Sequence, residues 1–116
     1  TSGYLSMGKF LSSGIPLPSA FAAANDSVAF GALKAFEEKG IRIPDEVSIV
    51  GIDDHPMSRY MRPALTTYRY DFLAVMRRLI EMIVHRIEDP DSEYPRREVF
   101  TPIFIERDSC RKGEAS

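Results

Sequence analysis

The sequence of 116 residues predicts an α/β fold, a parallel sheet flanked by helices. Two short and nearly continuous apolar runs, at residues 21–24 and 47–52, have the length of buried strands. Between them, from residue 27 to 39, apolar residues recur at helical spacing. A strand, a helix and a second buried strand form a right-handed parallel crossover, so both strands are expected to end at the same edge of the sheet.

The first half of the chain also predicts where its helices stop. A helix is expected over residues 3–12, and Gly14 follows it. The helix at 27–39 is followed by Gly40. Glycine adopts the left-handed conformation that commonly ends a helix, so both residues are predicted to terminate helices.

The second half of the chain predicts five further elements, which are an irregular or short helical connection at 55–61, a β-prone run at 63–70, a long helix at 72–88, and short strands at 97–101 and 103–105. Asp71 is expected to cap the long helix. The apolar arc of this helix is wide, so we expect it to be covered on more than one side. The acidic segment 88–93 lacks the glycine of a calcium loop and is expected to be a solvated turn.

Composition excludes several classes of protein. The net charge of −2 is spread along the chain without a basic block, which argues against direct binding of a phosphate backbone by this segment. The single cysteine, Cys110, cannot form an internal disulfide, which fits a reducing compartment. No apolar run approaches the roughly 20 residues of a membrane span, and the first residues lack a signal-peptide pattern. We therefore expect a soluble cytoplasmic protein, and the missing initial Met suggests a piece of a larger one.

Polar side chains follow both predicted buried strands. Asn25 and Asp26 come after the first, and Asp53 and Asp54 come after the second. Ligands of open parallel sheets bind beyond the carboxyl ends of the strands, so Asn25 and Asp53 are candidate binding residues. The alternative is that these residues only cap helices and strand ends, because Asn and Asp are favoured caps. We assign Asp26 as the helix cap, Asn25 to the binding edge and Asp54 to a structural role.

Signatures of catalysis and of metal binding are weak. Asp53, Asp54 and His55 are adjacent, but neighbouring residues on an extended chain point to opposite faces, and no second histidine lies at ligand spacing. The sequence has no Gly-rich phosphate loop, no nucleophile elbow and no suitable Cys/His pair. We therefore assign no catalytic residue, no cofactor and no metal. An enzyme on the same sheet remains a third alternative, because a fold alone does not fix function.

Four segments in order, residues 24–33, 40–54, 65–67 and 106–109, carry a family resemblance. Their sequences are Ala-Asn-Asp-Ser-Val-Ala-Phe-Gly-Ala-Leu, then Gly-Ile-Arg-Ile-Pro-Asp-Glu-Val-Ser-Ile-Val-Gly-Ile-Asp-Asp, then Leu-Thr-Thr, then Glu-Arg-Asp-Ser. They resemble the C-terminal part of the effector-binding core of LacI/GalR-type transcriptional regulators. Periplasmic sugar-binding proteins share the fold and a similar Asn-Asp turn, but the second and third segments are regulator-like.

The resemblance implies an architecture. The family has two similar α/β subdomains around a ligand cleft, preceded by a helix-turn-helix headpiece that binds operator DNA. This chain would then be a fragment of that architecture. Residues 1–70 would form the periplasmic-binding-protein-like C-terminal subdomain, and residues 102–116 a returning strand and tail. Between them, residues 71–101 would form a helix and a strand that normally pack on the N-terminal subdomain, which is absent here.

The resemblance also implies functional residues. Asn25, Asp53, Tyr70 and Phe72 would line the ligand cleft. Tyr70 stands where many relatives carry Gln, so the effector need not be that of a Gln-bearing relative; Tyr can stack on a sugar or a base and offers one hydroxyl. A carboxylate such as Asp53 can accept two hydroxyl donors at once, which suits a vicinal diol.

Three residues, Phe30, Leu33 and Tyr60, match the face that relatives use for dimerisation. Ordinary core packing is an equal alternative for Leu33. The helix at 72–88 would lack its usual partner sheet, and a bare apolar face of this size exceeds what a soluble monomer tolerates. We therefore expect a homodimer in which this helix pairs with a second chain, by simple association or by exchange of residues 72–101.

Taken together, the residues and the resemblance predict the effector-sensing portion of a bacterial DNA-binding transcriptional regulator of the repressor type. Its ligand would be small and polar, such as a sugar, a nucleoside or a nucleobase, bound in a cleft between subdomains. The alternative is a periplasmic-type solute-binding protein. A secretion signal upstream of this segment would favour transport, and a helix-turn-helix would favour regulation.

Overall fold

The computed structural model describes residues 2–93, 95 and 97–113. The chain divides into two compact units. The first unit consists of Thr1–Arg69 and Phe104–Ser116, and the second unit consists of Tyr70–Ile103. The assignment of these parts to the subdomains of a larger protein stays a prediction.

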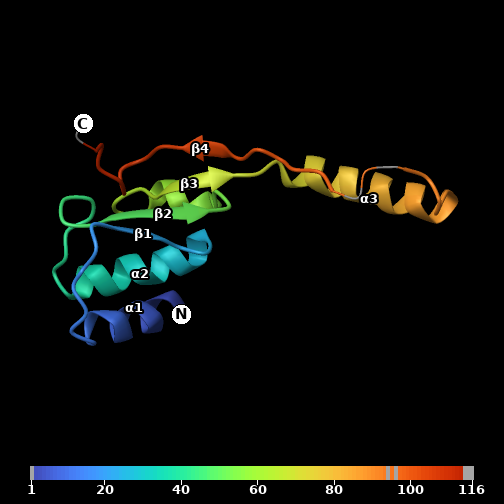
Figure 1. Ribbon diagram of the computed structural model, residues 1–116. Helices are drawn as coiled ribbons and strands as arrows, with labels where there is room; N and C mark the ends of the chain where they lie inside the picture. Colours follow the sequence, from blue (N-terminus) through green and yellow to red (C-terminus); the bar gives the residue numbers. More distant parts are fainter. Residues whose placement is uncertain (1, 94, 96, 114–116) are drawn as a thin grey trace. The chain divides into compact units, whose positions relative to one another are not determined.

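The elements alternate between helices and strands along the first unit (Figure 1). In chain order they are α1 (Ser2–Leu11), β1 (Ala20–Ala22), α2 (Asp26–Glu38), β2 (Ser48–Ile52), the short 3-10 helix η1 (Pro56–Tyr60), β3 (Thr66–Arg69) and, after the second unit, β4 (Ile103–Ile105). The second unit contains α3 (Phe72–Glu88). None of the helices in the described part of the chain has the length and apolarity needed to cross a bilayer.

The sheet confirms the predicted parallel crossover. Its strand order is β1-β2-β3-β4, and β2 pairs in parallel with both β1 and β3. Residues of β2 are buried on both faces, apart from partial exposure of Val50 and Ile52. Helices α1 and α2 lie on the same side of the sheet (Figure 1). The carboxyl ends of β1 and β2 are therefore neighbours at one sheet edge.

The hydrophobic core lies between α2 and the sheet. One face of α2 buries Ala29, Ala32, Leu33 and Phe36 against Val47, Ile49 and Leu65. Burying one side chain of the size of Phe or Ile contributes about 1.5–3 kcal/mol. This packing fixes α2 and thereby its first residues, which lie at the edge where the strands end.

The predicted helix ends agree closely with the structure. Helix α3 spans the predicted residues, and the Asp71 carboxylate accepts a hydrogen bond from the Ala74 N–H at 2.9 Å, as expected of a cap. Gly14 and Gly40 have φ values of 76° and 70° and end their helices in the left-handed conformation.

Two strand predictions need correction. Strand β1 ends at Ala22, two residues earlier than predicted. Residues 97–101 form no strand. Instead Arg97, Glu98 and Phe100 lie against α3, where Glu98 forms an ion pair with Arg78. Side-chain contacts with the helix take the place of the strand that was predicted for these residues.

Candidate functional site

The candidate site lies where β1 and β2 end. The turn after β1 carries Asn25 and Asp26, and β2 is followed by Asp53, Asp54 and His55. A hydrogen bond of 2.8 Å from the His55 N–H to the Asp26 carboxylate joins the two turns directly. The structure therefore brings together the two strand ends that the sequence singled out, at the edge where ligands of open parallel sheets bind.

Asn25 caps helix α2. Its Oδ1 accepts a hydrogen bond from the Val28 N–H at 2.9 Å, and its backbone is extended with φ −160°. The prediction that Asp26 is the cap was wrong. Among the described residues no hydrogen bond uses the Asn25 side-chain NH₂ group, so its two donors can still serve a ligand.

Asp26 is instead a buried junction. Only 1% of the surface of Asp26 is exposed. Oδ2 accepts hydrogen bonds from the His55 N–H at 2.8 Å and the Ser58 hydroxyl at 2.5 Å, while Oδ1 accepts one from the Thr67 hydroxyl at 2.6 Å. These donors come from the β2–β3 connection and from β3, so a single carboxylate ties both to the start of α2.

Asp53 is exposed at the end of β2. Its φ is 112° and that of Asp54 is 49°, both within the region that favours glycine. Such strain, of the order of 1–3 kcal/mol per residue, persists only where the surroundings hold the backbone, and it concentrates at functional sites. The Asp53 N–H donates to the Tyr68 carbonyl at 2.8 Å, which anchors the start of the strained segment.

Asp54, the next residue, forms ion pairs with two arginine residues, and its carboxylate is nearly buried. Its side chain is 5% exposed and contacts the guanidinium groups of Arg107 at 2.5 Å and Arg69 at 3.4 Å. Arg107 also donates to the Leu65 carbonyl at 2.9 Å. The structural role expected for Asp54 fits these contacts. Arg107 was not singled out as a functional residue, although it lies inside one of the four family-like segments.

The remaining cleft candidates lie in the second unit. Tyr70 is 42% exposed and Phe72, the first residue of α3, is 68% exposed. Both side chains therefore present surface to solvent. Their place in one site with Asn25 and Asp53 stays a prediction.

The three predicted interface residues differ in burial. Tyr60 is 66% exposed on η1. Phe30 is partly buried, and its ring meets the His55 ring edge-on with centroids 5.5 Å apart. Leu33 is 5% exposed within the core, as in the alternative considered for it, which leaves little of its side chain for a partner.

His55 has a local structural task. Its Nδ1 accepts a hydrogen bond from the Met57 N–H at 3.1 Å, which caps η1. Within the part of the chain that the structure describes, no three His, Cys, Asp or Glu residues are grouped so that they could hold a metal ion.

Comparison with known proteins identifies relatives of this chain. Residues 3–110 match the family described as periplasmic binding protein-like domain. The HTH-type transcriptional repressor PurR of Haemophilus influenzae is 38% identical over 112 residues, which cover 94% of this chain and 33% of that protein. The chain thus spans about a quarter to a third of the length of the curated relatives it matches.

Comparison with solved structures also identifies transcriptional regulators as relatives of this chain. The lac repressor dimer bound to operator and the anti-inducer ONPF superposes with a TM-score of 0.82 at 28% identity, covering 94% of this chain and 37% of that one. A LacI family transcriptional regulator from Enterococcus faecium with bound ribose gives a TM-score of 0.73 at 30% identity, covering 93% and 39%. Both similarities extend over nearly the whole chain and a minor part of the relative.

The Asp54–Arg107 pair should matter for stability. Replacing Arg107→Ala removes the closest cation from a nearly buried carboxylate, so we expect the free energy of unfolding to fall by about 3 kcal/mol in urea denaturation. The matched control is Arg42→Ala, whose ion pair with Glu46 is exposed to solvent and is expected to contribute little to stability. Equal small losses in both variants would contradict this assignment.

Proposed function

The chain belongs to the periplasmic-binding-protein-like domain family, in its LacI/GalR-type branch, and we propose that it is the effector-sensing part of a transcriptional repressor. The curated relatives with similar sequences bear the names of HTH-type transcriptional regulators. This supports regulation over solute transport and over enzymatic turnover. Binding of operator DNA would need a headpiece outside this chain, and the place of action would be the cytoplasm.

The observation that carries the proposal is the geometry of Asp53. An exposed carboxylate stands at the end of a buried parallel strand, on a backbone held at φ 112°. Ionised carboxylates accept hydrogen bonds from two hydroxyl groups at once, and each such bond is worth roughly 1.5–3 kcal/mol. The Asn25 amide adds donors from the neighbouring strand end. A polar ligand with adjacent hydroxyl or ring N–H groups, such as a sugar or a nucleobase, would fit the pair formed by Asp53 and Asn25.

Tyr70 and Phe72 would complete the cleft with aromatic surface. Aromatic rings pack against the apolar faces of sugars and bases, and the Tyr70 hydroxyl can donate or accept one hydrogen bond. The bound ribose of the E. faecium relative supports a sugar as one ligand class. Tyr70 in place of the Gln of many relatives would then contribute to the choice of effector.

Homodimerisation is the second part of the proposal. Phe30 and Tyr60 would contact a partner, with Leu33 supporting that face from inside the core. A solved relative, the lac repressor, is described as a dimer. Effector binding and DNA binding could then be linked, because a ligand shifts a conformational equilibrium by its difference in affinity for the two states.

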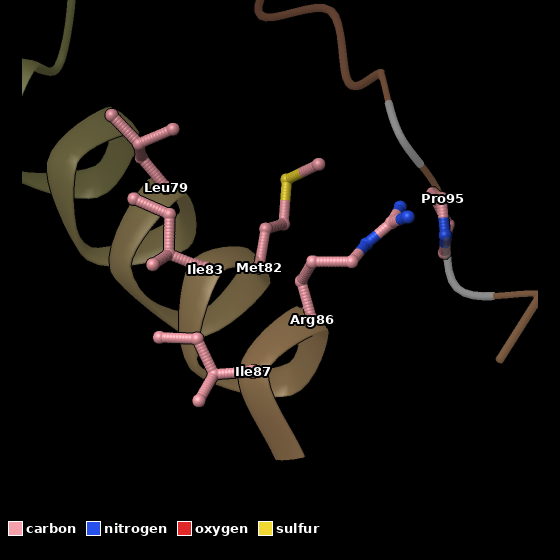
Figure 2. Close-up of a pocket in the computed structure, with 6 residues that line it drawn as sticks. All are labelled: Leu79, Met82, Ile83, Arg86, Ile87 and Pro95. Atoms are coloured by element: carbon pink, nitrogen blue, oxygen red, sulfur yellow. The ribbon is translucent and has the colours of Figure 1, made fainter. Parts of the chain in front are cut away.

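Helix α3 has an apolar surface that calls for a partner. None of its residues is buried, and its exposed apolar side chains are Phe72, Leu73, Met76, Leu79, Ile80, Ile83, Val84 and Ile87. Leu79, Met82, Ile83 and Ile87 line an apolar groove of about 460 Å³ on the helix together with Arg86 and Pro95 (Figure 2). We propose that a second chain covers this surface, by association or by exchange of residues 72–101.

The ligand site can be tested by thermal shift. Sugars and nucleobases are screened on the complete regulator, the Asp53→Ala variant and the control Asp45→Ala, which removes an exposed carboxylate before the start of β2, at the opposite end of that strand from Asp53. A ligand that raises the melting temperature of the parent should do so equally in Asp45→Ala and lose most of its effect in Asp53→Ala. Equal shifts in all three proteins would count against the site.

The α3 surface can be tested by sedimentation. At micromolar concentration this chain should sediment as a dimer, and Ile83→Glu should yield a monomer because it places a charge in the apolar groove. The control Arg77→Glu changes an exposed position of the same helix and should remain dimeric. A parent chain that is monomeric throughout would overturn the proposed pairing.

A further inference from the structure

We infer that Asp26 is the positioning residue for Asp53: its buried carboxylate holds residues 53–55 in the strained conformation that presents the Asp53 side chain at the sheet edge. This inference rests on the proposed function for the identity of Asp53 as a ligand residue. Asp26 itself is 1% exposed and would not touch the ligand. Its effect would pass through the backbone.

Three consecutive backbone N–H groups hold the strained segment. That of Asp53 donates to the Tyr68 carbonyl at 2.8 Å, that of Asp54 to the Thr67 hydroxyl at 3.4 Å, and that of His55 to Asp26 Oδ2 at 2.8 Å. The first acceptor, the Tyr68 carbonyl, belongs to the backbone hydrogen bonds of the sheet, and such an acceptor would be present in any pair of parallel strands. The other two acceptors are side chains, so they decide whether the chain turns sharply after the strand.

Asp26 controls both of these side-chain acceptors. It accepts the His55 N–H directly, and it also accepts the Thr67 hydroxyl at 2.6 Å. A hydroxyl group can donate one hydrogen bond, and the Thr67 hydroxyl donates it to Asp26 Oδ1. The lone pairs of the Thr67 oxygen are therefore free to face the Asp54 N–H. Loss of the Asp26 carboxylate would disturb the anchoring of Asp54 and His55 together.

The carboxylate is itself fixed in place. Asp26 is the first residue of α2, directly after the cap residue Asn25. A Cβ atom on Gly51 would lie 2.2 Å from Asp26 Oδ1, so the carboxylate packs directly against the backbone of β2. The Ser58 hydroxyl at 2.5 Å provides the remaining hydrogen bond. Asp26 is thus held by a helix and by the strand that carries Asp53, and it can transmit this rigidity to residues 53–55.

Asparagine could not replace Asp26 without a local change. All three partners donate to the carboxylate, and the backbone N–H of His55 cannot reverse its role. In the Asp26→Asn variant, an amide oxygen that faces His55 would turn the amide NH₂ group toward Thr67. The Thr67 hydroxyl would then accept a hydrogen bond from that NH₂ group, and its own hydrogen would lose its acceptor, Asp26 Oδ1. The hydroxyl would have to reorient, which would disturb its contact with the Asp54 N–H.

Amide hydrogen exchange on this chain tests the inference without any ligand. Asp26→Asn and Thr67→Val should accelerate exchange at Asp54, whose N–H bonds the Thr67 hydroxyl, at least tenfold beyond the average change of the core amides. The control Ser109→Ala removes an equally buried hydroxyl that bonds Thr66 N–H and the Ile49 carbonyl but not Asp26. Apart from Thr66, whose N–H loses its acceptor, it should change exchange uniformly. Uniform acceleration in Asp26→Asn and Thr67→Val as well would overturn the inference.

The strain itself supplies a second readout. Asp53→Gly should raise the urea midpoint of the parent chain, because glycine adopts φ 112° without a Cβ clash. In the Thr67→Val and Asp26→Asn backgrounds the segment relaxes, and less than half of this gain should remain. An unchanged gain would contradict the inference. If Asp26→Asn does not fold, Thr67→Val carries both measurements, and neither depends on whether a sugar or nucleobase binds.

Discussion

The arrangement of this sheet edge depends on one buried carboxylate. Placing a carboxylate inside a protein is unfavourable unless hydrogen bonds replace its hydration. Asp26 meets this condition with three donors, from His55, Ser58 and Thr67, at 2.5–2.8 Å. Those donors lie on segments that are distant in sequence, so satisfying the carboxylate also fixes the start of α2, the connection after β2 and strand β3 relative to each other. Gly51 makes room for it, because any larger residue there would contact Asp26 Oδ1.

Core and site are linked through the same helix. The apolar face of α2 packs on β2 through Ala29 and Phe36, while its first turn stands at the edge where the strands end. The core therefore determines where Asn25 can reach, and the Asp26 junction determines how Asp53 is presented. Residues with a structural role adjoin the proposed ligand residues directly in the sequence. Asp26 is buried and Asn25 is partly exposed, and Asp54 is ion-paired whereas Asp53 is open to solvent. Such a division would suit the proposed sensor, because the candidate ligand residues adjoin residues that the structure holds in place.

Local patterns predicted much of this structure. Apolar periodicity and cap residues identified both ends of α3, and two continuous apolar runs identified the parallel crossover. The helix cap was assigned to Asp26 and belongs to Asn25, because cap preferences treat Asn and Asp alike. The side-chain partners of Asp26 are Ser58 and Thr67, which lie 32 and 41 residues away, so no local pattern indicated them. The family-like segments contain Asp26, Thr67 and Arg107, yet a sequence alone does not state which of them meet. The strand predicted for residues 97–101 is absent for a related reason, because these residues contact α3, and the sequence does not state that contact.

Under the function that we propose, this chain is part of a regulator's sensing domain, and its ligand would be held at the ends of two parallel strands. The most direct test is a crystal structure of the complete effector-binding domain with a bound sugar or nucleobase. We expect polar atoms of the ligand within hydrogen-bonding distance, about 2.7–3.2 Å, of the Asp53 carboxylate and the Asn25 amide. A ligand bound elsewhere, with Asp53 facing solvent, would contradict this view of the site.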